Sequence, residues 1–140
     1  MAGDINRKRI LVVAGDETVR HFCRASLAPD LYHVELVSGM HEALGSLRSV
    51  PYDLVISDIE VPKLDGIDLY IIILKKYPYL KNRFLFIIGD CSTDLPSFLS
   101  YVQIGYLAKP IKISELIEAV GKAAAERPMT PGSSSRDRSL

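Results

Sequence analysis

Short, continuous runs of apolar residues alternate with longer stretches of helical periodicity along most of this chain. The apolar runs, which are typical of buried strands, cover 10–13, 34–37, 54–57, 84–88 and 106–108. The stretches between and after them predict five helices, at about 19–27, 40–47, 68–76, 95–102 and 113–124. Strands that lack polar alternation are expected where both faces of a sheet are buried. The pattern therefore predicts an α/β fold, a five-stranded parallel sheet with helices on both faces.

The length of the chain fits one domain of this kind. With 140 residues and a hydrophobic content of 48%, the chain can bury a core but is short for two domains. We predict that this domain occupies residues 1–126. Residues 127–140 are rich in Pro, Ser and Arg, and we predict a disordered tail there because the apolar content is too low to offset the entropy of ordering.

Charge, cysteine content and hydropathy argue against several classes of function. Seventeen basic residues balance 17 acidic ones, and a net charge of zero argues against general electrostatic binding to nucleic acid. The two cysteines, Cys23 and Cys91, form no C-x-x-C pair, which favours reduced thiols over a disulfide framework or zinc site. No apolar stretch approaches the roughly 20 residues that a membrane span needs. We therefore expect a cytoplasmic protein that binds neither nucleic acid nor membranes.

Residues able to carry chemistry follow several of the predicted strands. In an open α/β sheet, functional groups gather beyond the carboxyl ends of the strands. Asp16 lies in the loop after the first strand, Asp58 ends the third, Gly89 and Asp90 follow the fourth, and Lys109 follows the fifth. A carboxylate and a lysine that end buried strands lower each other's desolvation cost if they meet. We therefore expect Asp58 and Lys109 to be in contact.

Over roughly residues 8–126 the chain resembles the receiver domains of two-component response regulators. The resemblance lies in ILVVAGDETVR (10–20), YDLVISDIEVPKLDG (52–66), RFLFIIGD (83–90) and YLAKP (106–110). It implies a flavodoxin-like topology with strand order 2-1-3-4-5. It also implies that Asp58 is the candidate phosphoacceptor and that Lys109 is the charge partner of Asp58 or of its phosphoryl group.

Two features of the receiver pattern are missing, at three positions. Receivers carry an acidic pair after the first strand, which holds Mg²⁺ together with the phosphoacceptor, but this chain has Ala14 and Gly15 there. They also carry a Ser or Thr at the end of the fourth strand, where this chain has Gly89. Asp16 lies one residue beyond the missing pair, and we favour a helix N-cap over a metal ligand for it. A single carboxylate at Asp58 is a poor site for a cation that demands near-octahedral oxygen ligation.

These departures favour a degenerate receiver that is not an enzyme, needs no cofactor and acts by binding other proteins. The alternative is a working receiver that a histidine kinase phosphorylates on Asp58, with Mg²⁺ held weakly by Asp16 and Asp58. Asp58 and Lys109 also fit a purely structural ion pair. A flavin-binding protein would share the fold class, but the first loop, 14–18, lacks the run of hydroxyl residues that such loops use for phosphate.

Two surfaces are candidates for contact with partners, which we expect to be a signalling protein, a histidine kinase or a second copy of the chain. Tyr106 occupies the position of the receiver aromatic that turns inward on activation, and Gly89 leaves space for it, so we predict that its ring stays inward permanently. The helix near 68–76 is too apolar for one solvated face. We predict that Ile71 faces outward from it and contacts a partner, although an isolated exposed apolar residue is also normal.

Overall fold

The computed structural model describes residues 7–58, 60–61, 64–89, 99 and 104–125. Several sequence-based predictions fall outside these residues, namely those for Asp90, Cys91, the helix over 95–102 apart from Leu99, and the tail 127–140. Leu99 itself is buried, and its carbonyl accepts a hydrogen bond of 2.9 Å from the Ile104 amide.

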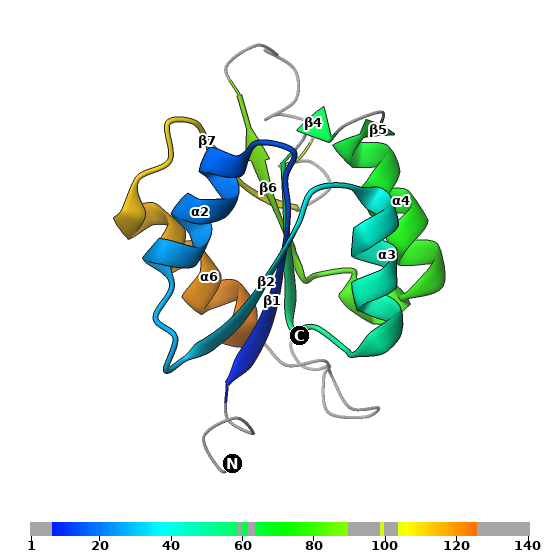
Figure 1. Cartoon of the computed structure of the whole chain (residues 1–140), viewed down its shortest axis with the longest axis horizontal. Coiled ribbons are helices and arrows are strands. Elements are labelled where there is room, and N and C mark those ends of the chain that lie inside the picture. The colour runs from blue at the N-terminus through cyan, green and yellow to red at the C-terminus, as the bar shows by residue number, and fades with distance from the viewer. Residues whose placement is uncertain (1–6, 59, 62–63, 90–98, 100–103, 126–140) are drawn as a thin grey trace, which may run out of the picture.

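A five-stranded parallel sheet forms the centre of the molecule (Figure 1). Its strands are β1 (Lys8–Val13), β2 (Tyr32–Val37), β3 (Leu54–Asp58), β6 (Phe84–Ile88) and β7 (Gly105–Ala108). They lie in the order β2-β1-β3-β6-β7, and every neighbouring pair is parallel. When these five strands alone are numbered in chain order, the order in the sheet is 2-1-3-4-5. This confirms the predicted fold class and topology.

The described helices cover both faces of the sheet (Figure 1). They are α2 (Glu17–Ser26), α3 (Met40–Ser49), α4 (Gly66–Lys76), the 3₁₀ helix η1 (Pro78–Leu80) and α6 (Ile113–Ala125). Helices α2 and α6 pack on one face of the sheet, and α3 and α4 pack on the other. Parallel strands need connections that cross over a face of the sheet, as these helices do, because a hairpin can join only antiparallel strands.

The segment between β3 and α4 contains two short strands that the sequence pattern does not predict. Two-residue strands β4 (Glu60–Val61) and β5 (Leu64–Asp65) pair there in an antiparallel ladder. Helix α4 begins at Gly66, two residues before the predicted start at Asp68. Runs as short as β4 and β5 have no periodicity from which they could be predicted.

Burial divides the sheet into a buried centre and partly exposed edges. Strands β3 and β6 are buried along their whole length, as is the Ile10–Val13 part of β1. Edge strand β2 is half-buried except at Val37, and β7 at the other edge is only partly buried. The prediction that the strands are buried on both faces therefore holds for the three central strands, because an edge strand has a neighbour on one side only.

No helix in the described part of the chain is both long enough and apolar enough to cross a membrane.

Candidate functional site

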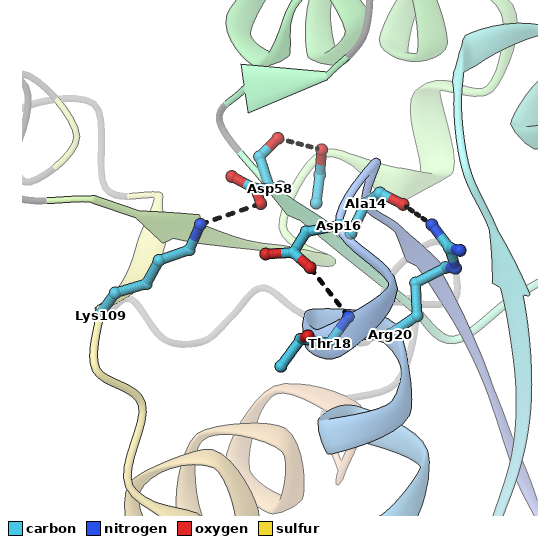
Figure 2. Close-up of polar contacts among 7 residues, drawn as sticks. Ala14, Asp16, Thr18, Arg20, Asp58 and Lys109 are labelled. Atoms are coloured by element: carbon cyan, nitrogen blue, oxygen red, sulfur yellow. Dashed lines mark hydrogen bonds and ion pairs between the residues drawn. The ribbon is translucent and has the colours of Figure 1, made fainter.

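Asp58 and Lys109 meet at the carboxyl edge of the sheet (Figure 2). Asp58 is the last residue of β3, and Lys109 follows the end of β7. Lys109 Nζ donates a hydrogen bond of 3.2 Å to Asp58 Oδ2. Since β6 lies between β3 and β7, the lysine side chain reaches across one strand to make this contact. The predicted contact between the two residues is therefore present.

The two partners of this ion pair differ in their access to water. The Asp58 side chain is 4% exposed and the Lys109 side chain is 34% exposed. The backbone of Lys109 is fixed because its amide donates a hydrogen bond of 2.8 Å to the Ile88 carbonyl at the end of β6. The buried carboxylate thus has a cationic partner whose backbone is anchored and whose ammonium group can also reach solvent.

A buried thiol lies within electrostatic range of Asp58. Cys23 of α2 is fully buried, and burial, with a smaller contribution from the Asp58 charge, raises the pKa of its thiol to about 12. At neutral pH this thiol is therefore protonated. It contributes packing at the site, and its reactivity is low because the thiolate is the reactive form.

The loop after β1 offers little ligand chemistry to the site. Ala14 is buried and presents only a methyl group, and Gly15 has no side chain. Asp16 is the N-cap of α2, and its Oδ1 accepts a hydrogen bond of 2.8 Å from the Thr18 amide (Figure 2). This confirms the predicted N-cap, a common role of aspartate at helix starts.

The structure also reveals a contact that sequence analysis did not predict. Arg20 Nη1 donates a hydrogen bond of 2.6 Å to the Ala14 carbonyl (Figure 2). This bond closes the loop between β1 and α2 and brings a guanidinium next to the position where an acidic side chain is missing. Its only sequence signal is an arginine six residues after Ala14, which does not specify the conformation of the loop.

The described residues do not form a recognisable metal site. No group of three or more His, Cys, Asp or Glu side chains in the described part of the chain is placed to hold a metal ion. One Asp58 oxygen already accepts from Lys109, and one Asp16 oxygen already accepts from Thr18. Mg²⁺ prefers several oxygen ligands in octahedral geometry, so this donor set does not fit it.

Gly89 directly follows β6, and Tyr106 lies in the neighbouring strand β7, where it pairs with Phe86. A Cβ atom added to Gly89 would meet no atom of the described residues within 4 Å. Tyr106 of β7 is half-buried and packs against the hydrophobic cluster on the face covered by α3 and α4. Its ring is thus packed inward in this structure. That it stays inward permanently is still a prediction.

Helix α4 presents its residues as the periodicity predicted. Leu69 and Ile73 are fully buried, and Tyr70 packs edge-on against Phe84 with ring centroids 4.8 Å apart. Ile71 is 45% exposed on the opposite side of the helix. The prediction that Ile71 faces outward is confirmed, and its role in a partner contact is still a prediction.

Comparison with known proteins places the chain in a family. Residues 10–121 match the response regulator receiver domain family. The response regulator receiver protein CpdR of Brucella abortus is 30% identical over 116 residues, which cover 82% of this chain and 95% of CpdR. The DNA-binding transcriptional regulator NtrC of Proteus hauseri is 27% identical over 122 residues, which cover 85% of this chain but 25% of NtrC.

Solved structures show the same architecture. The non-phosphorylated HemR receiver domain from Leptospira biflexa superposes with a TM-score of 0.75 at 27% identity, covering 89% of this chain and 100% of that one. The signal receiver domain of an HD domain-containing protein from Pseudomonas fluorescens Pf-5 superposes with a TM-score of 0.74 at 30% identity, covering 85% and 95% of the two chains.

Proposed function

Because the chain belongs to the response regulator receiver domain family, we propose that it is a receiver of two-component signalling in which magnesium-dependent phosphorylation is impaired. It acts by binding other proteins and is not an enzyme. The observation that carries this proposal is the strand-end site, where Asp58 is bonded to Lys109 and the loop after β1 supplies Ala14 and Gly15 in place of acidic side chains.

The donor set at the site supports the loss of the metal. The family pattern calls for two acidic side chains beside the phosphoacceptor, and neither Ala14 nor Gly15 has a side-chain oxygen. The Ala14 carbonyl already accepts from the Arg20 guanidinium. A positive charge beside the loop further disfavours a second cation. The domain therefore needs no cofactor in this proposal.

Without a metal ion, Lys109 is a cation that still lies within bonding distance of Asp58. Phosphoryl transfer is catalysed mainly by positioning and by cations that neutralise the charge on the transferring oxygens. A single ammonium group, which also neutralises Asp58 itself, supplies only part of that stabilisation. Asp58 is thus a candidate phosphoacceptor that reacts slowly, and in the resting domain the Asp58–Lys109 pair holds two strand ends together.

The signalling side of the switch is altered as well. Receivers use a hydroxyl at the end of the fourth strand to contact the phosphoryl group, and Gly89 has none. Tyr106 already packs against the hydrophobic core, and no described atom would contact a Cβ at Gly89. This arrangement supports an output face that holds one conformation whether or not Asp58 is modified.

A domain with a fixed output face acts through constitutive contacts. We propose a cytoplasmic signalling protein, a histidine kinase or a second copy of this chain as the partner, with Ile71 on α4 as a contact residue because it is exposed and apolar. The zero net charge supports a domain that does not itself bind nucleic acid or anionic membranes. The name of NtrC states DNA binding, but the match covers only 25% of NtrC, so we assign no DNA-binding role to this domain.

The test is phosphorylation by a small-molecule donor. The protein is incubated with Mg²⁺ and acetyl phosphate and weighed intact by mass spectrometry under mild acid. We expect no added phosphoryl group on the natural chain and one on the Ala14→Asp, Gly15→Asp double variant. Adding Asp58→Asn to that double variant serves as the control, because it removes the acceptor and must abolish the gain.

A second readout does not depend on reactivity. A cation that binds the folded state at 100 times its Kd stabilises it by about 2.7 kcal/mol. We therefore expect excess Mg²⁺ to leave the thermal midpoint of the natural chain unchanged and to raise that of the double variant.

The alternative is a working receiver that a histidine kinase phosphorylates on Asp58, with Asp16 completing a weak Mg²⁺ site. It predicts one phosphoryl group on the natural chain, its loss in Asp58→Asn, and a rise in thermal midpoint with Mg²⁺. The Asp16 N-cap bond to Thr18 disfavours this alternative, because a ligand role competes with the cap. Those three results together would replace the proposal with the alternative.

A further inference from the structure

The outer edge of β2 can accept a further strand. Among the described strands β2 pairs with β1 alone, with α2 on one face of the sheet and α3 on the other (Figure 1). The Val37 carbonyl accepts a hydrogen bond of 3.1 Å from the Ala14 amide on the β1 side. Because backbone groups alternate along a strand, the odd-numbered residues of β2 bond toward β1, and Val34 and Leu36 direct their amides and carbonyls outward. These outward groups are a template for pairing with another strand.

The side chains along this edge are basic at one end and acidic at the other. The odd-numbered residues of β2 point to the face covered by α3, where Val37 belongs to the core. At the beginning of the strand, Arg7 Nη2 donates a hydrogen bond of 3.1 Å to His33 Nδ1. Toward its end, Glu35 and Glu42 line a groove of about 460 Å³ between β2 and α3, and the described residues that line it include no lysine or arginine. An edge with this polarity is complementary to a second copy of itself that runs in the opposite direction.

One antiparallel register satisfies both the backbone and the charges. When a two-fold axis passes through Val34, each Val34 faces its counterpart, and outward backbone groups of one copy meet outward groups of the other. His33 then lies directly opposite Glu35 of the second copy, with the Arg7 guanidinium beside it. Opposite charges at directly paired positions stabilise a sheet. Shifting the axis by one residue would instead place the two Glu35 carboxylates opposite each other, which is unfavourable.

The groove and the residue before β2 fit the same arrangement. Apart from one glutamate, α3 contributes only small residues to the groove, namely Gly45, Ser46 and Ser49. Its volume is therefore available to the basic side chains of the second copy. Leu31 is 59% exposed, and in this register it lies opposite Val37 of the second copy. An exposed apolar side chain thus gains an apolar neighbour across the pair of strands.

One contact within the chain competes with this pairing. Arg24 Nη2, from α2, donates a hydrogen bond of 2.8 Å to the Val34 carbonyl. This carbonyl is the acceptor that the Val34 amide of a second copy needs. The Arg24 side chain must release it when the strands pair, so we expect a reversible dimer.

We propose that two copies of this chain associate through antiparallel pairing of their β2 strands, centred on Val34, to form one continuous sheet. Arg7 and His33 of each copy face the acidic groove of the other at Glu35. The pairing covers an edge that would otherwise be open to other chains. This surface is separate from Ile71 on α4. The inference does not rest on the proposed function, because neither the pairing nor its test involves Asp58.

The test is sedimentation equilibrium of the full chain, which reports the dimer Kd, with far-UV circular dichroism to confirm that each variant is folded. The natural chain is expected to pass from monomer to dimer as its concentration rises. A natural chain that stays monomeric up to about 1 mM overturns the proposal, because a weaker interaction contributes almost no binding free energy.

A charge swap tests the register. Glu35→Lys sets a lysine opposite His33 and Arg7, and His33→Glu sets two glutamates opposite each other. Because the pair occurs twice in a two-fold dimer, each single variant should raise the Kd by about tenfold. The double variant His33→Glu, Glu35→Lys restores opposite charges and should return the Kd to within about threefold of the natural value. Glu118→Lys, at an exposed position on α6, is the matched control for net charge and should leave the Kd unchanged. A double variant that is no tighter than the single variants refutes this register.

Two further variants test the backbone pairing. Val34→Pro removes an outward amide and no bond to β1, so it should abolish the dimer, since proline is tolerated where an edge amide faces solvent. Arg24→Ala removes the competing donor and should lower the Kd by about tenfold, because that bond is given up twice in each dimer. A folded Val34→Pro chain that still dimerises, or a weaker dimer in Arg24→Ala, contradicts pairing at Val34. A dimer that Ile71→Lys abolishes would run through α4, which also contradicts the proposal.

Discussion

Removal of Lys109 should destabilise the domain more than removal of Asp58, although the two residues share one ion pair. Lys109→Met leaves the Asp58 carboxylate, 4% exposed, without its ammonium partner. Asp58→Asn leaves an ammonium group that is 34% exposed and can turn to water. The asymmetry follows because losing an ion-pair partner costs more for a charge that water cannot reach than for one that it can.

The magnitudes follow from these exposures. Removing one partner from a fully buried ion pair costs about 3–5 kcal/mol, whereas an exposed pair contributes about 0–1 kcal/mol. With one buried and one half-solvated partner, we expect Lys109→Met to lower the free energy of unfolding by about 2 kcal/mol. Asp58→Asn keeps the side-chain shape and should cost no more than about 0.5 kcal/mol. The double variant should lose about as much as Asp58→Asn alone, which corresponds to a coupling of about 2 kcal/mol between the two positions.

Urea denaturation followed by far-UV circular dichroism measures these values, because the chain has no tryptophan to report by fluorescence. In a thermal scan, Lys109→Met should lower the midpoint by about 8 °C. Lys112→Met, at an exposed position three residues further on, is the matched control and should change little. Equal losses for the two single variants, or additive losses in the double variant, would refute the argument that the buried carboxylate dominates.

Three further predictions concern other parts of the domain. Asp16→Ala removes the cap on the Thr18 amide and should lower the free energy of unfolding, measured by urea denaturation, by about 1 kcal/mol. Asp16→Asn keeps a capping oxygen and should retain most of that stability. Equal losses in the two variants would assign the effect to the charge of Asp16. Burial raises the pKa of Cys23 from 9.0 to about 12. The contribution of the protonated thiol to the free energy of unfolding is therefore fully present below pH 9.0 and is lost as the pH rises toward 12. Cys23→Ala should flatten that slope, and peptide mapping should find Cys23 alkylated by iodoacetamide at pH 8 only after unfolding; labelling of the folded chain would contradict this. Ile71→Lys should abolish self-association that runs through α4, and an unchanged sedimentation profile would exclude this helix as the interface.

Much of the candidate site could be predicted from sequence because its residues are marked by strand ends. Asp58 and Lys109 each follow an apolar run, and the carboxyl ends of parallel strands share one edge of the sheet. Asp16 precedes a helical stretch at the usual cap position, so its bond to Thr18 was also predictable. These inferences depend on local pattern and on the parallel arrangement alone.

Other features depended on how distant segments pack. The bond from Arg20 to the Ala14 carbonyl requires a particular loop conformation that no residue pattern specifies. The unequal exposure of Asp58 and Lys109 arises because the lysine crosses β6 from the partly exposed edge strand β7 to the buried strand β3.

The sequence by itself determined the elements, their parallel arrangement and the residues that gather at the strand ends, because periodicity and strand boundaries are local properties of the chain. Only the tertiary structure decided which edges of the sheet stay open, how far each charge reaches into solvent, and that β2 and α3 enclose an acidic groove. These properties depend on the separation and twist of segments that are far apart in sequence, and side-chain periodicity carries no information about them.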